Sequence, residues 1–99
     1  MQTKEELLNK IGELEEAAEG LANWKKRSAL LKIIGLRMRV ESFALSDIAN
    51  VMSTIDTSGV EEINKLIQKA KDSQLVQRAR VKNLNKAIQY FKKVYLAVV

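Results

Sequence analysis

The side chains that could carry chemistry in this chain are carboxylates, because histidine and cysteine are both absent. Without them the chain lacks the commonest general base and the softest metal ligands, and neither a Ser-His nor a Cys-His nucleophile can be built. Paired carboxylates can still hold a hard cation or act as an acid and a base. The candidates form two clusters: Glu13, Glu15, Glu16 and Glu19, and Asp56, Glu61 and Glu62.

Both clusters have a simpler interpretation as charged faces of helices. Glutamates that recur within one amphipathic segment usually form its solvated side. Neither a GxxxxGK[ST] nor a GxGxxG motif occurs, so no glycine-rich loop is predicted to hold a phosphate. We therefore predict no enzymatic activity, no catalytic or metal-binding residue, no cofactor and no small-molecule substrate.

The formal net charge of +5 is unevenly distributed along the chain. Residues 1–22 carry six glutamates and two lysines, whereas residues 73–99 carry six basic side chains and no acidic one. On a helix most of the latter fall on one side, and three further cations recur every seven residues in an earlier segment. The side chains of these two basic stripes are Lys25, Lys32, Arg39, Arg78, Lys82, Lys86 and Lys93.

The two basic stripes predict a track for the phosphate backbone of a nucleic acid or for another polyanion. The alternative is a pair of solvated faces that keep the protein soluble, or cations paired with the glutamates of the first segment. Charge patterning alone leaves both interpretations open.

Residues 45–67, LSDIANVMSTIDTSGVEEINKLI, have the outline of two short helices around a polar turn, as in a DNA-reading helix-turn-helix. The second helix of that motif enters the major groove through its N-terminal residues, which here are Glu61 and Glu62. Acids there would face phosphates, and no arginine is placed to read guanine. We interpret the stretch as the corner of a helical bundle.

Periodicity and composition predict an all-α fold. Proline is absent and only four glycines occur, so long helices are permitted throughout. In the first helix, a capping box at Thr3 and Glu6 marks the start, and Gly20 and Asn23 mark the end. Its apolar seam repeats at steps of four and three, as in helices that pack lengthwise. The seam is Leu7, Ile11, Leu14, Ala18 and Leu21.

The second helix, at about 24–40, is apolar on two faces. The wider face is Trp24, Leu30, Leu31, Ile34 and Met38, and the other is Ala29, Ile33, Leu36 and Val40. Because a helix that is apolar on two sides normally lies between neighbours, we predict that this helix is central in the bundle.

The region after residue 40 allows two interpretations. Either Ser42 or Ser46 caps a short separate helix, or the second helix continues with a bend. DTSG, residues 56–59, is the strongest turn signal in the chain, and Ser58 with Glu61 forms a second capping box.

The segment 60–98 reads as one long helix or as two. Its heptad positions are apolar at both ends and polar at Gln74 and Gln77, so we favour a break near residue 72, where Ser73 would cap the new helix. Arg80 points toward the apolar side of the last helix. Either its aliphatic part lies along the apolar side while the guanidinium reaches solvent at the edge, or the guanidinium pairs with a glutamate of the first helix or with another protein.

These patterns predict a single helical domain over residues 1–99, an antiparallel bundle of three to five helices. The predicted function is a non-enzymatic interaction protein, an adaptor, inhibitor or regulator, that acts through helical surfaces on a protein partner or on a second copy of itself. The alternative is a small basic nucleic-acid-binding protein. No membrane span is predicted, and the polar N-terminal segment favours a cytoplasmic location.

Overall fold

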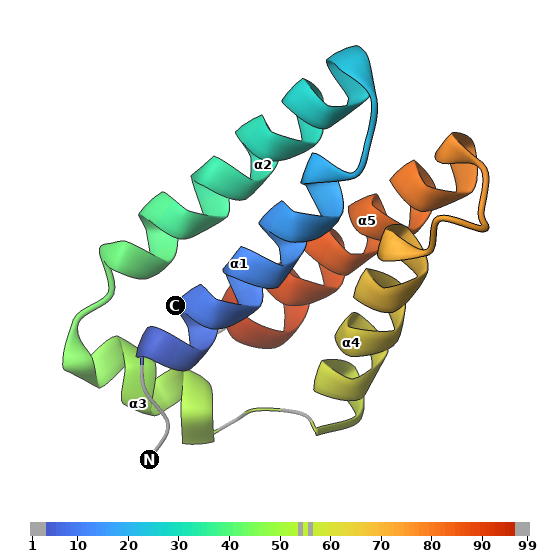
Figure 1. Ribbon diagram of the computed structural model, residues 1–99. Helices are drawn as coiled ribbons and strands as arrows, with labels where there is room; N and C mark the ends of the chain where they lie inside the picture. The colour runs from blue at the N-terminus through green and yellow to red at the C-terminus, as the bar shows by residue number, and fades with distance from the viewer. Residues whose placement is uncertain (1–3, 54, 56, 97–99) are drawn as a thin grey trace.

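The computed structural model describes residues 4–53, 55 and 57–96, in which no strand occurs. The helices are α1 (Lys4–Glu19), α2 (Asn23–Glu41), α3 (Leu45–Ser53), α4 (Thr57–Lys71) and α5 (Gln77–Phe91), and a π-helical turn, η1 (Lys92–Leu96), continues α5. Figure 1 shows that α1 and α2 form one antiparallel hairpin and α4 and α5 a second. The predicted all-α bundle is confirmed.

Helix α1 takes the inner position in this bundle, because it packs against α2, α4 and α5 at once. The seam predicted for it is buried, and Leu7, Ile11 and Leu14 are each at most 1% exposed. The short helix α3 lies across the end of the bundle that holds the start of α1, where it contacts η1 (Figure 1).

The prediction that the second helix is central is wrong. Helix α2 lies at the edge of the bundle (Figure 1) and contacts α1 and α5 through one face only. That face is Ala29, Ile33, Leu36 and Val40, all at most 5% exposed. Of the wider apolar face, Leu30 packs partly against the core, whereas Trp24, Leu31, Ile34 and Met38 are exposed. They stay exposed because α1 occupies the position between the other helices and no other helix of the described residues covers α2.

The predicted break near residue 72 is confirmed, since α4 ends at Lys71 and α5 begins at Gln77. The carboxylate of Asp72 accepts a hydrogen bond from the backbone N–H of Gln74 (2.9 Å), a local turn that stops the helix. The residue that caps α5 is Val76, which has no hydroxyl or carboxylate to offer, and not Ser73 as predicted.

Helix α3 is separate from α2, but neither serine predicted to cap it does so. The carboxylate of Asp47 reaches back to accept a hydrogen bond from the N–H of Ala44 (2.9 Å), which is half of a capping box. Ser42 instead closes α2, where its hydroxyl donates to the Arg39 carbonyl (2.6 Å). Ser46 lies within the first turn of α3.

Helix α4 begins one residue earlier than the second capping box predicted. It starts at Thr57, so Ser58 lies in its first turn. Thr3 of the first predicted capping box and Asp56 of the predicted turn lie outside the described residues.

Arg80 joins the C-terminal ends of two helices to the start of a third. From the first turn of α5 its Nε donates a hydrogen bond to the carbonyl of Ala70 in the last turn of α4 (2.9 Å). Its guanidinium also lies against Gly20 just after α1, where an added Cβ would stand 2.5 Å from Nη2. Helix C-termini present unpaired carbonyls, so a cation there is stabilising. The predicted ion pair of Arg80 with a glutamate of the first helix is replaced by these contacts.

We expect Arg80→Met to destabilise the fold by about 1.5–3 kcal/mol, the range for a hydrogen bond to a charged group, because the thioether keeps the apolar stem but cannot donate. Chemical denaturation followed by far-UV circular dichroism measures the change. Arg78→Met, an exposed site two residues away on the opposite side of α5, is the control and should stay within about 0.5 kcal/mol of the parent. Equal stability of the two variants would contradict this account of Arg80.

Candidate interaction surfaces

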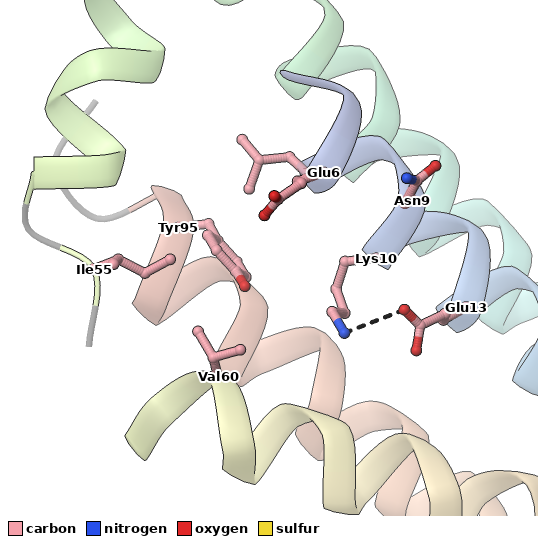
Figure 2. Close-up of a pocket in the computed structure, with 8 residues that line it drawn as sticks. Glu6, Asn9, Lys10, Glu13, Ile55, Val60 and Tyr95 are labelled. Atoms are coloured by element: carbon pink, nitrogen blue, oxygen red, sulfur yellow. Dashed lines mark ion pairs between the residues drawn. The ribbon is translucent and has the colours of Figure 1, made fainter. Parts of the chain in front are cut away.

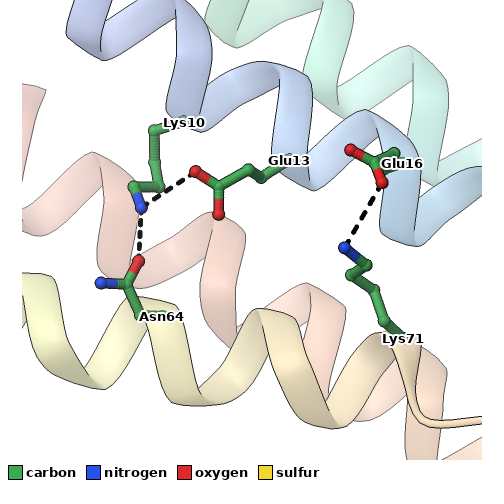
Figure 3. A network of polar contacts seen from close by, with 5 residues as sticks. All are labelled: Lys10, Glu13, Glu16, Asn64 and Lys71. Carbon is green, nitrogen blue, oxygen red and sulfur yellow. Dashed lines mark hydrogen bonds and ion pairs between the residues drawn. The ribbon is translucent and has the colours of Figure 1, made fainter.

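The glutamates of α1 face basic side chains of the neighbouring helices. Figure 3 shows Glu16 reaching Lys71 of α4 (3.4 Å), and Lys10 bridging Glu13 (3.2 Å) and the side-chain oxygen of Asn64. These contacts fix the angle between α1 and α4 around the apolar seam.

The pairing continues between α1 and α2. Both carboxylate oxygens of Glu15 accept from Arg37, at 2.6 and 3.3 Å, and Glu19 lies 3.8 Å from Lys26. The hydrogen bonding of the Arg37 guanidinium to Glu15, which accepts, is the main cause that raises the pKa of Arg37 above its ordinary value. The acidic first helix is thus partly complementary to the basic second one, as the charge distribution allowed.

The carboxylate clusters do not form a metal site among the described residues, where no three acidic, histidine or cysteine side chains converge. In the second cluster Glu61 is exposed and Glu62 lines a groove between α4 and α5. Glu15, Glu16 and Glu19 of the first cluster therefore make contacts between helices, whereas Glu61 of the second is at the surface and Glu62 is half-buried.

A cavity of about 250 Å³ lies between α1, the start of α4 and η1 (Figure 2). Its walls combine the polar side chains of Glu6, Lys10 and Glu13 with the ring of Tyr95. The volume is below the roughly 300–1,000 Å³ of most small-molecule sites. Tyr95 is 5% exposed, and its ring packs at 4.8 Å from that of Phe91.

Tyr95 is held in its neutral form by this position. Burial is the main cause that raises the pKa of its phenol, and the negative charges of Glu6 and Glu13 add to the effect. The hydroxyl is therefore a hydrogen-bonding group in this cavity and not a base.

The structure brings the two predicted basic stripes together. Lys32 of α2 donates to the Asn85 side chain of α5 (3.2 Å), and Lys25 and Lys32 line a groove between these two helices with Asn85. At the other end of α2, Arg39 donates to the carbonyl of Leu96 in η1 (3.4 Å).

The remaining predicted cations lie on α5. Lys86 and Lys93 line the groove toward α4, where the Lys93 ammonium stands 5.9 Å from the centre of the Tyr90 ring. Arg78 and Lys82 are exposed on α5, and the helical repeat places them on the outer side between the two grooves. These seven side chains of α2, α5 and η1 are called here the basic face.

Sequence analysis did not predict that one apolar side of α2 would be exposed. Four large apolar side chains of α2 are exposed: Trp24 (69%), Leu31 (65%), Ile34 (47%) and Met38 (67%). They lie opposite the buried face of the same helix by the 3.6-residue period, and are called here the α2 stripe. The signal was the second apolar face of this helix, which sequence reasoning assigned to the core.

No family model matches the chain, and neither the curated proteins nor the solved structures include a match to it. Within residues 4–53, 55 and 57–96, no helix is both long enough and apolar enough to cross a bilayer. The function is therefore inferred from the surfaces of the protein itself.

We expect the raised pKa of Tyr95 to make the fold less stable at alkaline pH. Above the ordinary phenol pKa of about 10 the unfolded chain releases this proton and the folded chain retains it, so the free energy of unfolding falls as pH rises through that value. Urea denaturation at pH 8 and at about pH 11 measures the loss, which should be smaller in Tyr95→Phe. Equal losses in both proteins would contradict the assignment.

Proposed function

We propose that this protein is a non-enzymatic interaction protein, an adaptor, inhibitor or regulator, that binds a partner helix along the α2 stripe. The observation that carries the proposal is the exposure of Trp24, Leu31, Ile34 and Met38 on one side of one helix. Large contiguous apolar patches on soluble proteins commonly mark interaction sites, since leaving them in water is unfavourable.

The shape of the α2 stripe supports a helical partner. Trp24, Leu31 and Met38 are seven residues apart and Ile34 lies between them, so the side chains form a ridge along the helix. A ridge of this spacing fits the apolar seam of another helix laid alongside it, as in helix-to-helix recognition generally.

The contacts of the acidic side chains support the non-enzymatic part of the proposal. Glu15, Glu16 and Glu19 each pair with a cation of another helix, which favours a structural role for them. The cavity beside Tyr95 is small and holds a phenol whose pKa is raised, which does not favour a base there.

A second candidate function is the binding of a nucleic acid or another polyanion by the basic face. The observation that favours it is the contact of Lys32 with Asn85, which joins the two basic stripes across α2 and α5. Among the described residues, the ion pairs involve Lys10, Lys26, Arg37 and Lys71, and none of the cations that the basic face draws from α5.

Photo-crosslinking in the host cell tests the first candidate. A benzophenone amino acid at position 31 or 38 should form an adduct of defined mass, because both positions lie in the α2 stripe. The same group at position 65, exposed on α4, is the control and should give none. The absence of any adduct from both positions of the stripe would contradict the proposal.

Fluorescence anisotropy with labelled random single- and double-stranded oligonucleotides tests the second. Contacts to phosphate predict binding at about 50 mM salt that falls steeply by about 200 mM. Lys82→Gln should weaken it and lower the salt slope by about 1, whereas Lys65→Gln on α4 should not. No binding at the lower salt concentration would exclude this function.

A further inference from the structure

The α2 stripe continues into two charged residues at the same spacing. If Trp24, Leu31 and Met38 are the a positions of a heptad, then Arg27, Ile34 and Glu41 are the d positions. The seam thus has an apolar centre, a cation near its N-terminal end and an anion at its C-terminal end. It spans 18 residues, Trp24 to Glu41, or about 27 Å of helix.

We propose that the partner of the α2 stripe is a second copy of this chain, and that the two α2 helices pair antiparallel. This inference rests on the proposed function and names its partner. In an antiparallel pair each a position meets a d position of the other copy, so Leu31 packs on the partner's Ile34 at the centre. In the same register Trp24 faces the partner's Glu41 and Met38 faces the partner's Arg27. Trp24 then lies within one helical turn of the partner's Met38, where an aromatic ring and sulfur can make a favourable contact.

The charges of the seam select this direction. Antiparallel helices bring Arg27 of each copy within one helical turn of the partner's Glu41. The dimer then has two ion pairs, each between a positive and a negative side chain. Parallel helices would stack Arg27 on the partner's Arg27 and Glu41 on the partner's Glu41, two contacts of like charge. Like charges brought together at an interface are costly, so the antiparallel pair is favoured.

The flanks of the seam permit close approach despite the many cations of α2. Ser28 and Gly35 border it on one side, and Leu30 and Arg37 on the other. Arg37 is the one cation among these four, and it is already paired with Glu15 of the same chain. The lysines of α2 lie farther around the helix, on the sides that face α1 and α5.

Gly35 is compatible with a close neighbour. It lies in the middle of α2 beside the stripe, and a Cβ added there would meet no atom within 4 Å, as is also true of Gly12 in α1. Glycine in a helix interior is unfavourable relative to alanine, and none of the described residues requires the small size of Gly35. A second helix backbone approaching at this point is a reason for it.

The cost of association is reduced because α2 is already ordered by its buried face. A free helix of this length would be marginal in water, but here Ile33 and Val40 hold it against the core before any partner binds. The contact is small compared with standard interfaces of about 1,600 Å², so we expect a dissociation constant on the order of 1–100 μM.

Sedimentation equilibrium of the purified full chain tests the proposal, over about 1 to 300 μM so as to bracket that affinity. The apparent mass should rise from 11.2 kDa toward twice that value. Leu31→Glu should stay monomeric while keeping its helical circular dichroism. Val76→Asp is the matched control, since Val76 is similarly exposed (70%) at the start of α5, and it should dimerise like the parent.

The direction of pairing is tested by charge exchange. Arg27→Glu should weaken dimerisation about tenfold by turning both ion pairs into repulsions, and Arg27→Glu with Glu41→Arg should restore it. In a parallel dimer Arg27→Glu would replace one contact of like charge by another, so the single exchange would leave dimerisation nearly unchanged. A parent chain that stays monomeric throughout, or a Leu31→Glu variant that dimerises normally, would overturn the proposal.

The crosslinks from positions 31 and 38 distinguish a failure of this inference from a failure of the proposed function. An adduct of twice the chain mass agrees with the second copy. An adduct of another mass only, with a monomeric purified protein, overturns the inference and leaves the interaction function standing. No adduct at all removes both.

Discussion

The simultaneous packing of α1 against three other helices is the contact on which the rest of the structure depends. Its seam, with Leu7, Ile11 and Leu14 fully enclosed, fills the centre, and its glutamates orient α2 and α4 through ion pairs. Because α1 holds the inner position, α2 is left at the edge with one apolar face against the core. Among the described residues no other helix covers its second apolar face, which leaves the α2 stripe exposed.

Much of this fold follows from the sequence, because helical periodicity shows which sides of a helix are apolar. It gave the seam of α1 and the break between α4 and α5, where Gln74 and Gln77 interrupt the apolar positions. Periodicity does not show which of two apolar faces is covered, and for α2 that choice is made by α1. The role of Arg80 was equally out of reach, since it requires the ends of α1 and α4 to meet beside α5.

The two candidate surfaces of this protein share α2 and are linked by its geometry. The cations of the basic face were chosen from helical spacing and charge, and the contact of Lys32 with Asn85 links α2 and α5 between them. Around α2, Lys25 and Lys32 lie on the same side of the stripe as Ser28 and Gly35, toward α5. An antiparallel pair of α2 helices places these flanks together, so the two basic faces would lie on one side of the dimer and the acidic α1 helices on the other. Repulsion between them would be screened by salt, whereas polyanion binding would be weakened by it.

The central claim is that the α2 stripe is exposed on the single chain and covered on association. Trp24 is the only tryptophan of the chain and lies on this stripe at 69% exposure, so its fluorescence reports directly on that change. The most direct measurement is its emission spectrum and acrylamide quenching as a function of protein concentration. The account predicts water-like, readily quenched emission at high dilution, and blue-shifted, protected emission as dimers form. Emission that stays the same from the lowest to the highest concentration would contradict it.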